Sequence, residues 1–281
     1  MTTTAPRPLR RVPGWTGSGE CDLAAFAGAS TRYGTHGAVE TGTLGIRFGG
    51  VPAGLTLSHD DLIQAVRAAK LKGDPLLDKE DSLMARLPLS GDIGIFIVDA
   101  DYNALQARSI SDAEHYAREK AWAYLAACQT MPGWENAYLS VTGPILGTRE
   151  SRHVNAAYQL TAEDITSGRR FEDVVALGAW AMEYHDAAGA PSTWISVKDK
   201  ETYDIPLRTL ISVDTPNLYA AGRAADGDKY AGGSLRVMGT ALATGHAAGV
   251  AAALHAAAGN PVPARQVQQE LQKQDARLTG C

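Results

Sequence analysis

The stretch NLYAAGRAADGDKYAGGSLRVMGTALATGHAAGVAAALHAAA, residues 217–258, has the pattern of a strand, a loop and a helix in succession. The apolar run 218–221 ends at Gly222 and predicts a buried strand. A polar, glycine-containing loop follows over residues 223–233, and the Ala- and Gly-rich segment that begins near Ser234 predicts a buried helix. Because the free N–H groups and the positive dipole end of a helix point toward the preceding loop, this pattern predicts a site for an anionic group.

The composition bounds the class of protein. The chain has 281 residues, of which 20% are charged, and a net charge of −5, which suits one large or two ordinary globular domains. The acidic excess and the lack of long Lys/Arg clusters argue against binding to nucleic acid. No run of about 18 apolar residues is free of polar residues, so no membrane-spanning helix is expected. No apolar segment of a secretory signal follows the N-terminal arginines, and we expect a cytoplasmic protein.

The cysteines indicate neither a metal site nor a disulfide framework. Cys21, Cys128 and Cys281 share no metal-ligand spacing and form no even-numbered set. No C-x-x-C motif occurs, which excludes the chemistry of disulfide reductases. We therefore expect no bound metal and a reducing compartment.

The rest of the chain alternates short strands with helices. Residues 41–51 and 93–98 are predicted strands, and Ser58 and Ser111 are predicted helix N-caps. Residues 171–185 are predicted to form a helix. Strands interleaved with helices, without an internal repeat, indicate an α/β or mixed α+β fold.

Three segments, taken in order, carry a resemblance to a known family. TGSGECDLAAFAGAS (16–30) resembles an A-T-G-D-G-D-L-A-A-x-A-G-A element, and LGTRESRHVNAAYQLTAEDI (146–165) resembles a G-x-R-E-[ST]-R element. Residues 217–254 resemble a strand ending in A-G-R, a loop, and a helix with the pattern G-x-A-A-G-x-A-A-A. These elements are typical of FAD-dependent oxidoreductases of the glutathione-reductase-like flavoprotein class.

The departure from that family is as informative as the match. Such enzymes normally begin with a Rossmann unit whose G-x-G-x-x-G motif holds the FAD diphosphate, and this sequence contains no such motif. The chain therefore resembles the C-terminal half of a flavoenzyme. The resemblance implies a subunit of a split, heteromeric enzyme, with a second protein chain that carries the G-x-G-x-x-G half. The sheet edge and the apolar helix face that would otherwise be exposed are expected to be buried by that partner.

The expected domains follow from the resemblance. Residues 1–35 and 204–258 would form a partial FAD-binding, Rossmann-like domain that the partner chain completes. Residues 36–203 would form a substrate or cap domain. Residues 259–281 would be a C-terminal tail with a Gln-rich, solvated helix.

The resemblance also implies which residues bind FAD. Gly222 and Arg223 would lie near the ribityl chain or diphosphate, and the start of the helix would face the N1–C2=O edge of the flavin. The glycines of the T-G-S-G element would let the backbone pass close to the cofactor. The full set is Gly17, Ser18, Gly19, Gly222, Arg223, Gly233, Ser234, Leu235, Arg236, Val237 and Arg149.

Each of these assignments has a structural alternative. Gly222 and Arg223 could simply form a turn with a surface arginine. Residues 233–237 could simply form a glycine-rich loop that caps a core helix. Arg149 lies next to Glu150, so it serves equally well in a structural Arg–Glu network at a domain junction.

His185 is the candidate acid–base residue, because imidazole titrates near neutral pH and Glu183–His185 matches a D-x-H pattern of the family. A lone histidine is also common as a structural residue. Tyr203 and Tyr230 are candidate hydroxyl groups on the substrate side.

Together these expectations describe an enzyme subunit that dehydrogenates a small organic substrate by hydride transfer to flavin, while a basic side chain takes the proton. The alternative is a non-catalytic companion subunit, which retains the fold and stabilises or regulates a flavoprotein partner.

Overall fold

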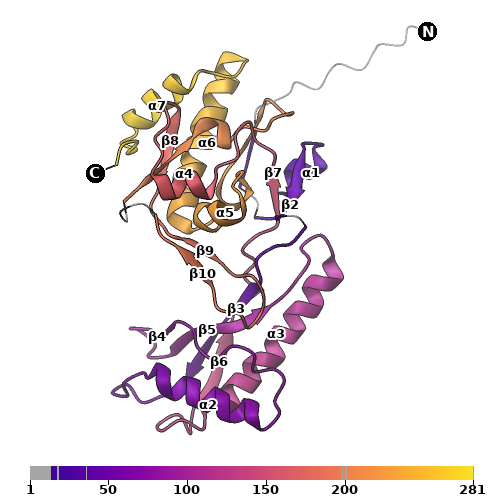
Figure 1. The fold of residues 1–281 in the computed structure, drawn as a ribbon, viewed down its shortest axis with the longest axis vertical. Helices are drawn as coiled ribbons and strands as arrows, with labels where there is room; N and C mark the ends of the chain where they lie inside the picture. The colour runs from indigo at the N-terminus through magenta and orange to yellow at the C-terminus, as the bar shows by residue number, and fades with distance from the viewer. Residues whose placement is uncertain (1–13, 18, 36, 198, 200, 281) are drawn as a thin grey trace, which may run out of the picture. The chain divides into compact units, whose positions relative to one another are not determined.

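The computed structural model describes residues 14–280, apart from 18, 36, 198 and 200. The chain divides into two compact units, which are treated separately below (Figure 1). Unit 1 contains the described residues of Met1–Ala38, Glu150–Glu183 and Trp194–Cys281. Unit 2 contains Val39–Arg149 and Tyr184–Thr193.

These units differ from the expected substrate domain of residues 36–203. Residues 150–183 and 194–203 lie in unit 1 because their strands pair with distant parts of that unit. The strand Arg152–Val154 pairs with Thr31–Tyr33. The strand Val174–Gly178 pairs with Tyr203–Pro206. The motifs of the sequence do not show such pairings, since they are set by contacts between segments far apart in the chain.

Unit 2 is a four-stranded antiparallel sheet with two helices on one face. The sheet order is β4-β5-β3-β6, and β3 lies at its centre between β5 and β6. Leu44, Ile46 and Phe48 alternate along β3 and are buried beneath the helices, as expected for one covered face of a sheet. The elements are β3 (Gly42–Gly49), α2 (His59–Leu71), β4 (Met84–Arg86), β5 (Ile93–Ala100), α3 (Ala107–Cys128) and β6 (Tyr138–Thr142).

The helix starts of unit 2 agree with the sequence at one position and differ at the other. Ser58 caps α2, and its hydroxyl accepts a hydrogen bond from the Asp61 amide at 3.1 Å. The predicted N-cap at Ser111 is wrong, because α3 begins one turn earlier, at Ala107. The Ser111 hydroxyl donates to the carbonyl oxygen of Ala107, a bond that a serine in a helix interior can make.

A buried lysine fastens α3 to the loop that precedes β4. Lys120 is fully buried, and its Nζ donates to Asp78 Oδ2 at 2.7 Å and to the carbonyl oxygen of Asp99 at 2.6 Å. Lys79 pairs with the Asp99 carboxylate at 2.8 Å, and the Tyr124 hydroxyl donates to the Lys79 carbonyl oxygen at 2.8 Å. Buried charges of this kind need every partner, because an unpaired charge in the interior is strongly unfavourable.

Unit 1 is built from several two-stranded sheets and a helical layer. β1 pairs in parallel with β12, whereas β2 with β7 and β8 with β11 are antiparallel. The chain leaves unit 1 within β9 (Met182–Tyr184) and returns within β10 (Thr193–Ile195), and these two strands pair with each other. The other elements are β1 (Gly14–Thr16), α1 (Asp22–Phe26), β2 (Thr31–Tyr33), β7 (Arg152–Val154), α4 (Ala162–Ser167), β8 (Val174–Gly178), β11 (Tyr203–Pro206), η2 (Leu207–Thr209), β12 (Leu218–Ala220), η3 (Gly222–Ala224), α5 (Lys229–Leu235), α6 (Met238–Ala258) and α7 (Ala264–Lys273).

The β1–β12 pair has one open edge in the part of the chain that the structure describes. On its far side β12 is bonded to residues 210–212, through Ala220 N–H to the Leu210 carbonyl and Ser212 N–H to the Leu218 carbonyl. β1 pairs only with β12 among the described residues, so β1 is the edge strand. A further strand would add at this edge.

Helix α6 is the central helix of unit 1. Its buried side chains, among them Thr244, Ala248 and Ala251, pack in the main core of the unit or beneath β12. Among the described helices it alone is long and apolar enough to cross a membrane, with a mean hydropathy of 1.2, a test that core helices also pass. One face of α6 packs in the core of unit 1, and the other carries the exposed side chains of Met238 and Leu242.

The C-terminal segment is packed rather than solvated. In α7, Val267 and Leu271 are buried in the same core as α6, which corrects the expectation of a solvated tail helix. The remaining polar side chains of α7 face away from that core, as an amphipathic helix requires.

The predicted helix over residues 171–185 is wrong. Its place is taken by β8 and β9, because β8 pairs antiparallel with β11. Gly178 is opposite Tyr203 in this pair, and a Cβ on Gly178 would lie 2.2 Å from the tyrosine ring. The β-branched Val174 and Val175 suit the pleated backbone, and the pairing partner decides the structure.

We predict that replacing Lys120 by Met lowers the free energy of unfolding by about 3 kcal/mol, because the substitution leaves Asp78 and the Asp99 carbonyl without their buried partner. The measurement is urea-induced unfolding followed by circular dichroism. Lys70→Met is the matched control, since Lys70 is partly exposed and pairs with Glu80 at the surface. Equal midpoints for both variants would contradict the role given to Lys120.

Candidate functional site

The parallel β1 and β12 strands bring two of the predicted segments to one edge of their sheet. Because parallel strands share a direction, the loop after Thr16 and the turn at Gly222 both leave from the carboxyl end of the pair. Gly222 has a φ of 59°, in the left-handed region that favours glycine, and its N–H donates to Thr244 Oγ1 in α6 at 3.0 Å. The ends of both strands therefore lie against the first turns of α6.

Arg223 ties the two segments together. Its Nε donates to the carbonyl oxygen of Gly19 at 2.8 Å, and its guanidinium pairs with Glu20 at 3.0 Å. A Cβ on Gly19 would lie 1.7 Å from the Arg223 guanidinium, so this close approach requires glycine unless the arginine moves. Gly19, Gly222 and Arg223 are thus brought together, next to Gly17, whereas Ser18 lies outside the described residues.

The predicted helix start at Ser234 is wrong, because two helices occupy this stretch. α5 begins after Asp228, whose carboxylate caps it by accepting hydrogen bonds from Tyr230 N–H at 3.1 Å and Ala231 N–H at 2.9 Å. α6 begins only at Met238, after the linking residues 236–237. The aspartate cap was visible in the sequence, and it was the signal for the earlier helix.

Gly233, Ser234 and Leu235 therefore lie inside α5, and Arg236 and Val237 link the two helices. A Cβ on Gly233 would lie 2.3 Å from the carbonyl oxygen of Glu183, and Arg236 donates to that same oxygen at 3.1 Å. Leu235 is buried in the core of unit 1. Through Gly233 and Arg236, the end of α5 thus packs against Glu183 in β9.

A pocket of about 500 Å³ opens at the N-terminus of α6. Its walls are mostly apolar, and its lining residues are Leu177, Ala179, Trp180, Glu183, Val237, Met238, Gly239 and Thr240. The N-cap residue Val237 offers no side-chain hydrogen bond, so the first N–H groups of α6 are left unsatisfied by the helix itself. This pocket, with its N–H donors at one end, is the candidate functional site.

Tyr203 lies under this site and is not exposed to it. Its hydroxyl is 2.7 Å from Ser234 Oγ, and Ser234 Oγ donates to the carbonyl oxygen of Trp180 at 2.6 Å. Burial raises the pKa of the Tyr203 hydroxyl above its usual range, although hydrogen bonds to Ser234 and Thr240 oppose this. Tyr203 is thus a protonated donor within the core at neutral pH.

His185 and Arg149 belong to unit 2. The main chain of His185 is held by the Glu40 carboxylate at 3.1 Å and by Thr41 N–H at 3.2 Å, and its Nδ1 is 3.0 Å from Ser192 Oγ. The ring is buried. Arg149 donates to the carbonyl oxygen of Thr41 at 2.6 Å and to Thr43 Oγ1 at 2.8 Å.

Tyr230 lies at a different pocket of unit 1. This pocket has a volume of about 440 Å³, and Arg32, Asp228 and Lys229 also line it. Asp228 Oδ2 accepts a hydrogen bond from the Ala162 amide at 2.8 Å. Asp228 therefore accepts hydrogen bonds from backbone N–H groups at the starts of α4 and α5. Tyr230 does not line the α6 pocket.

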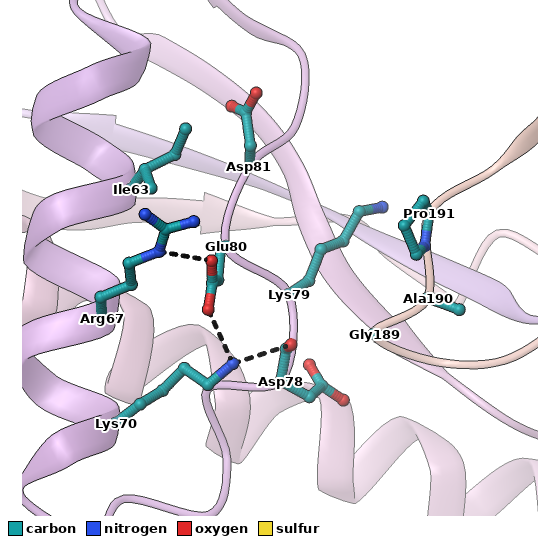
Figure 2. A pocket seen from close by; sticks show the side chains of 10 residues that line it. All are labelled: Ile63, Arg67, Lys70, Asp78, Lys79, Glu80, Asp81, Gly189, Ala190 and Pro191. Atoms are coloured by element: carbon teal, nitrogen blue, oxygen red, sulfur yellow. Dashed lines mark hydrogen bonds and ion pairs between the residues drawn. The ribbon is translucent and has the colours of Figure 1, made fainter.

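Unit 2 has a polar pocket of about 480 Å³ that the sequence gave no reason to expect (Figure 2). Arg67 and Lys70 both reach from α2 to Glu80, at 2.7 and 3.1 Å, and these two bonds hold the pKa of Glu80 below its usual value, the Arg67 bond most strongly. The third cation of the lining, Lys79, pairs with buried Asp99. Because its cations are matched by carboxylates, the pocket selects no class of ligand by charge.

Of the three cysteines, Cys281 lies outside the described residues, and Cys21 and Cys128 are both buried. Burial raises the pKa of Cys21 to about 11 and that of Cys128 to about 12, so both thiols stay protonated. Within the described ranges, no group of three or more His, Cys, Asp or Glu side chains is arranged to hold a metal ion.

A family model described as FAD dependent oxidoreductase matches residues 16–274 of the chain, well over half of its length. No curated protein and no solved structure matches. The matched range contains all three of the segments on which the resemblance was based.

We predict that Gly233→Ala destabilises the protein by about 1–3 kcal/mol, the usual effect of overpacking, because the new Cβ would meet the Glu183 backbone. Gly232→Ala is the matched control in the same helix, since a Cβ there would contact only the His153 ring at 3.9 Å. Thermal unfolding of the two variants is the measurement. If Gly233→Ala melted no lower than Gly232→Ala, α5 would not depend on this close contact.

Proposed function

Because the chain belongs to the FAD dependent oxidoreductase family, whose cofactor is FAD, we propose that it carries the flavin-facing end of an FAD site in a heteromeric enzyme. The enzyme dehydrogenates a small organic substrate. The observation that carries the proposal is the pocket at the N-terminus of α6, which lies beyond the strand ends where the family segments meet.

The residues of this pocket fit a flavin ring. Isoalloxazine is flat and apolar, with a polar pyrimidine edge, and the pocket combines apolar walls with the N–H groups of Met238 and Gly239. A Cβ on Gly239 would find nothing within 4 Å, so the backbone at the helix start is open to close approach. The positive end of the α6 dipole would stabilise negative charge at that edge.

The strand ends suit the sugar and diphosphate part of the cofactor. Gly17, Gly19 and Gly222 are the residues at which the backbone could approach it most closely. We assign Arg223 to ordering this loop, because its guanidinium already pairs with Glu20 and Gly19.

In the proposed reaction the bound FAD supplies the acceptor for a hydride from the substrate. The α6 N–H groups hold the polar edge of the ring, and the apolar walls exclude water from it. The family pattern makes His185 the proposed proton acceptor, and within unit 2 Ser192 orients its ring through Nδ1.

A second protein chain with the G-x-G-x-x-G half is the proposed partner. Two features of unit 1 support a partner surface: the open edge of β1 and an apolar face along α6. On that face Met238 is 84% exposed and Leu242 is 76% exposed. Gly245 and Gly249 follow on α6, and a Cβ on either would find nothing within 4 Å. A helix could pack closely there.

The companion-subunit alternative has one observation in its favour. Two of the three candidate catalytic side chains, His185 and Tyr203, are buried and bonded within the chain. Such contacts are typical of structural residues as well as of oriented catalytic ones.

We predict that the full chain, produced with its partner, carries bound FAD with the absorption spectrum of a flavoprotein.

His185→Ala is expected to lower kcat by about 10²–10⁴ while FAD stays bound, the usual contribution of a general base. Arg223→Ala is expected to weaken FAD binding by loosening the loop at Gly19. A complex without flavin would overturn the proposed function, and full activity in both variants would favour the companion role. If one longer polypeptide that includes this sequence bound FAD by itself, the FAD site would stand and only the proposal of a separate partner chain would fall.

We also predict opposite effects of Gly245→Ala on stability and on assembly. Alanine in a helix interior is favoured over glycine by about 1 kcal/mol, so the isolated chain should become slightly more stable. The added methyl group should weaken association with the partner, measured by size-exclusion chromatography or titration calorimetry. Gly54→Ala, in a loop of unit 2, is the control, because a Cβ there would find nothing within 4 Å and Gly54 has no positive φ. Unweakened assembly in Gly245→Ala would place the interface elsewhere.

A further inference from the structure

Trp180 is a large apolar side chain left half exposed beside the candidate flavin pocket. It lines the pocket and is 50% exposed. Its ring centre lies 6.4 Å from that of Trp194, which is 56% exposed, and the two rings are tilted by 56°. Trp180 thus brings to the pocket wall an exposed indole whose apolar surface a flat ligand would cover favourably.

A buried hydrogen-bond relay fixes the main chain of Trp180. Ser234 Oγ has a single proton, which it donates to the Trp180 carbonyl oxygen at 2.6 Å. The bond between Tyr203 and Ser234, at 2.7 Å, must therefore use the proton of the tyrosine. The raised pKa of the buried Tyr203 hydroxyl keeps that proton in place at neutral pH.

Two close backbone contacts restrain the segment on either side of Trp180. Before it, Gly178 lies against the ring of Tyr203, where a Cβ would come within 2.2 Å. After it, the carbonyl oxygen of Glu183 lies against Gly233 and accepts a hydrogen bond from Arg236. The segment thus has little freedom to shift, and the indole is held beside the start of α6.

We propose that Trp180 is the aromatic wall of the flavin pocket, which stacks on or against the isoalloxazine ring, and that Tyr203 and Ser234 are positioning residues for it. This inference rests on the proposed function, because it assumes that the pocket at α6 takes flavin. It gives Tyr203 and Ser234 a role through Trp180 in place of direct contact with substrate. The ligand it selects is a flat aromatic ring with a polar edge.

The test uses riboflavin, which has the isoalloxazine ring but no diphosphate, so that its binding does not need the G-x-G-x-x-G half. The full 281-residue chain is titrated with riboflavin while tryptophan emission and riboflavin fluorescence are recorded. Wild type should show saturable quenching of both. Trp180→Leu should bind roughly 3- to 10-fold more weakly, the range that aromatic pairs give.

Two further variants separate an aromatic wall from a merely structural residue. Trp180→Phe keeps a ring and should retain riboflavin affinity within about 2-fold, yet lose most of the tryptophan quenching. Tyr203→Phe should keep the far-ultraviolet circular dichroism of wild type but reduce the quenching of Trp180. Trp122→Leu, in α3 of unit 2 and 61% exposed, is the matched control and should bind riboflavin as wild type does.

The possible results are distinguishable. Equal riboflavin affinity and equal quenching in Trp180→Leu and wild type would overturn the inference and leave the proposed function standing. The same titrations with FAD on the assembled enzyme decide the case in which riboflavin does not bind to the chain alone. If FAD also fails to bind the assembled enzyme, the proposed function falls and the inference falls with it.

Discussion

The short parallel pairing of β1 with β12 is the constraint on which the site depends. It joins residues at opposite ends of the chain, and it fixes the direction in which both strands leave the sheet. Arg223 then closes the gap between the two loops, and Gly222 connects them to α6 through Thr244. Without this pairing the glycine loops and the helix start would have no common edge.

Local patterns in the sequence predicted the elements that depend on neighbours in the chain. The strand before Gly222, the strand that begins at Ile93 and the cap at Ser58 all agree with the structure. The failures share one cause. Residues 171–185 were predicted as a helix, yet β8 is a strand because β11 pairs with it from about 30 residues further along. The division into units depends on similar distant pairings, which no local pattern records.

The sequence pointed to the segments that surround the candidate pocket but not to the contacts within it. The family segments placed residues 1–35 and 204–258 in one domain, and in the structure Arg223 does contact Gly19, while the role of these residues in binding FAD stays a prediction. The sequence could not show that Tyr203 and Ser234 bond to each other, since they meet only when β11 packs under α5. It also gave no weight to Trp180, whose importance depends on being exposed beside a pocket, a property that belongs to the folded surface.

The chain order of β1 and β12 sets a sequence of events during synthesis on the ribosome. β12 leaves the ribosome some two hundred residues after β1, so β1 must wait for its partner. The sheet and helices of unit 2 lie between them and can form earlier, because their contacts are mostly local to residues 39–149. The β1–β12 edge and the candidate pocket are thus completed after the sheet of unit 2. A ribosome that stalls before Leu218 would release a chain with a finished sheet domain and no site.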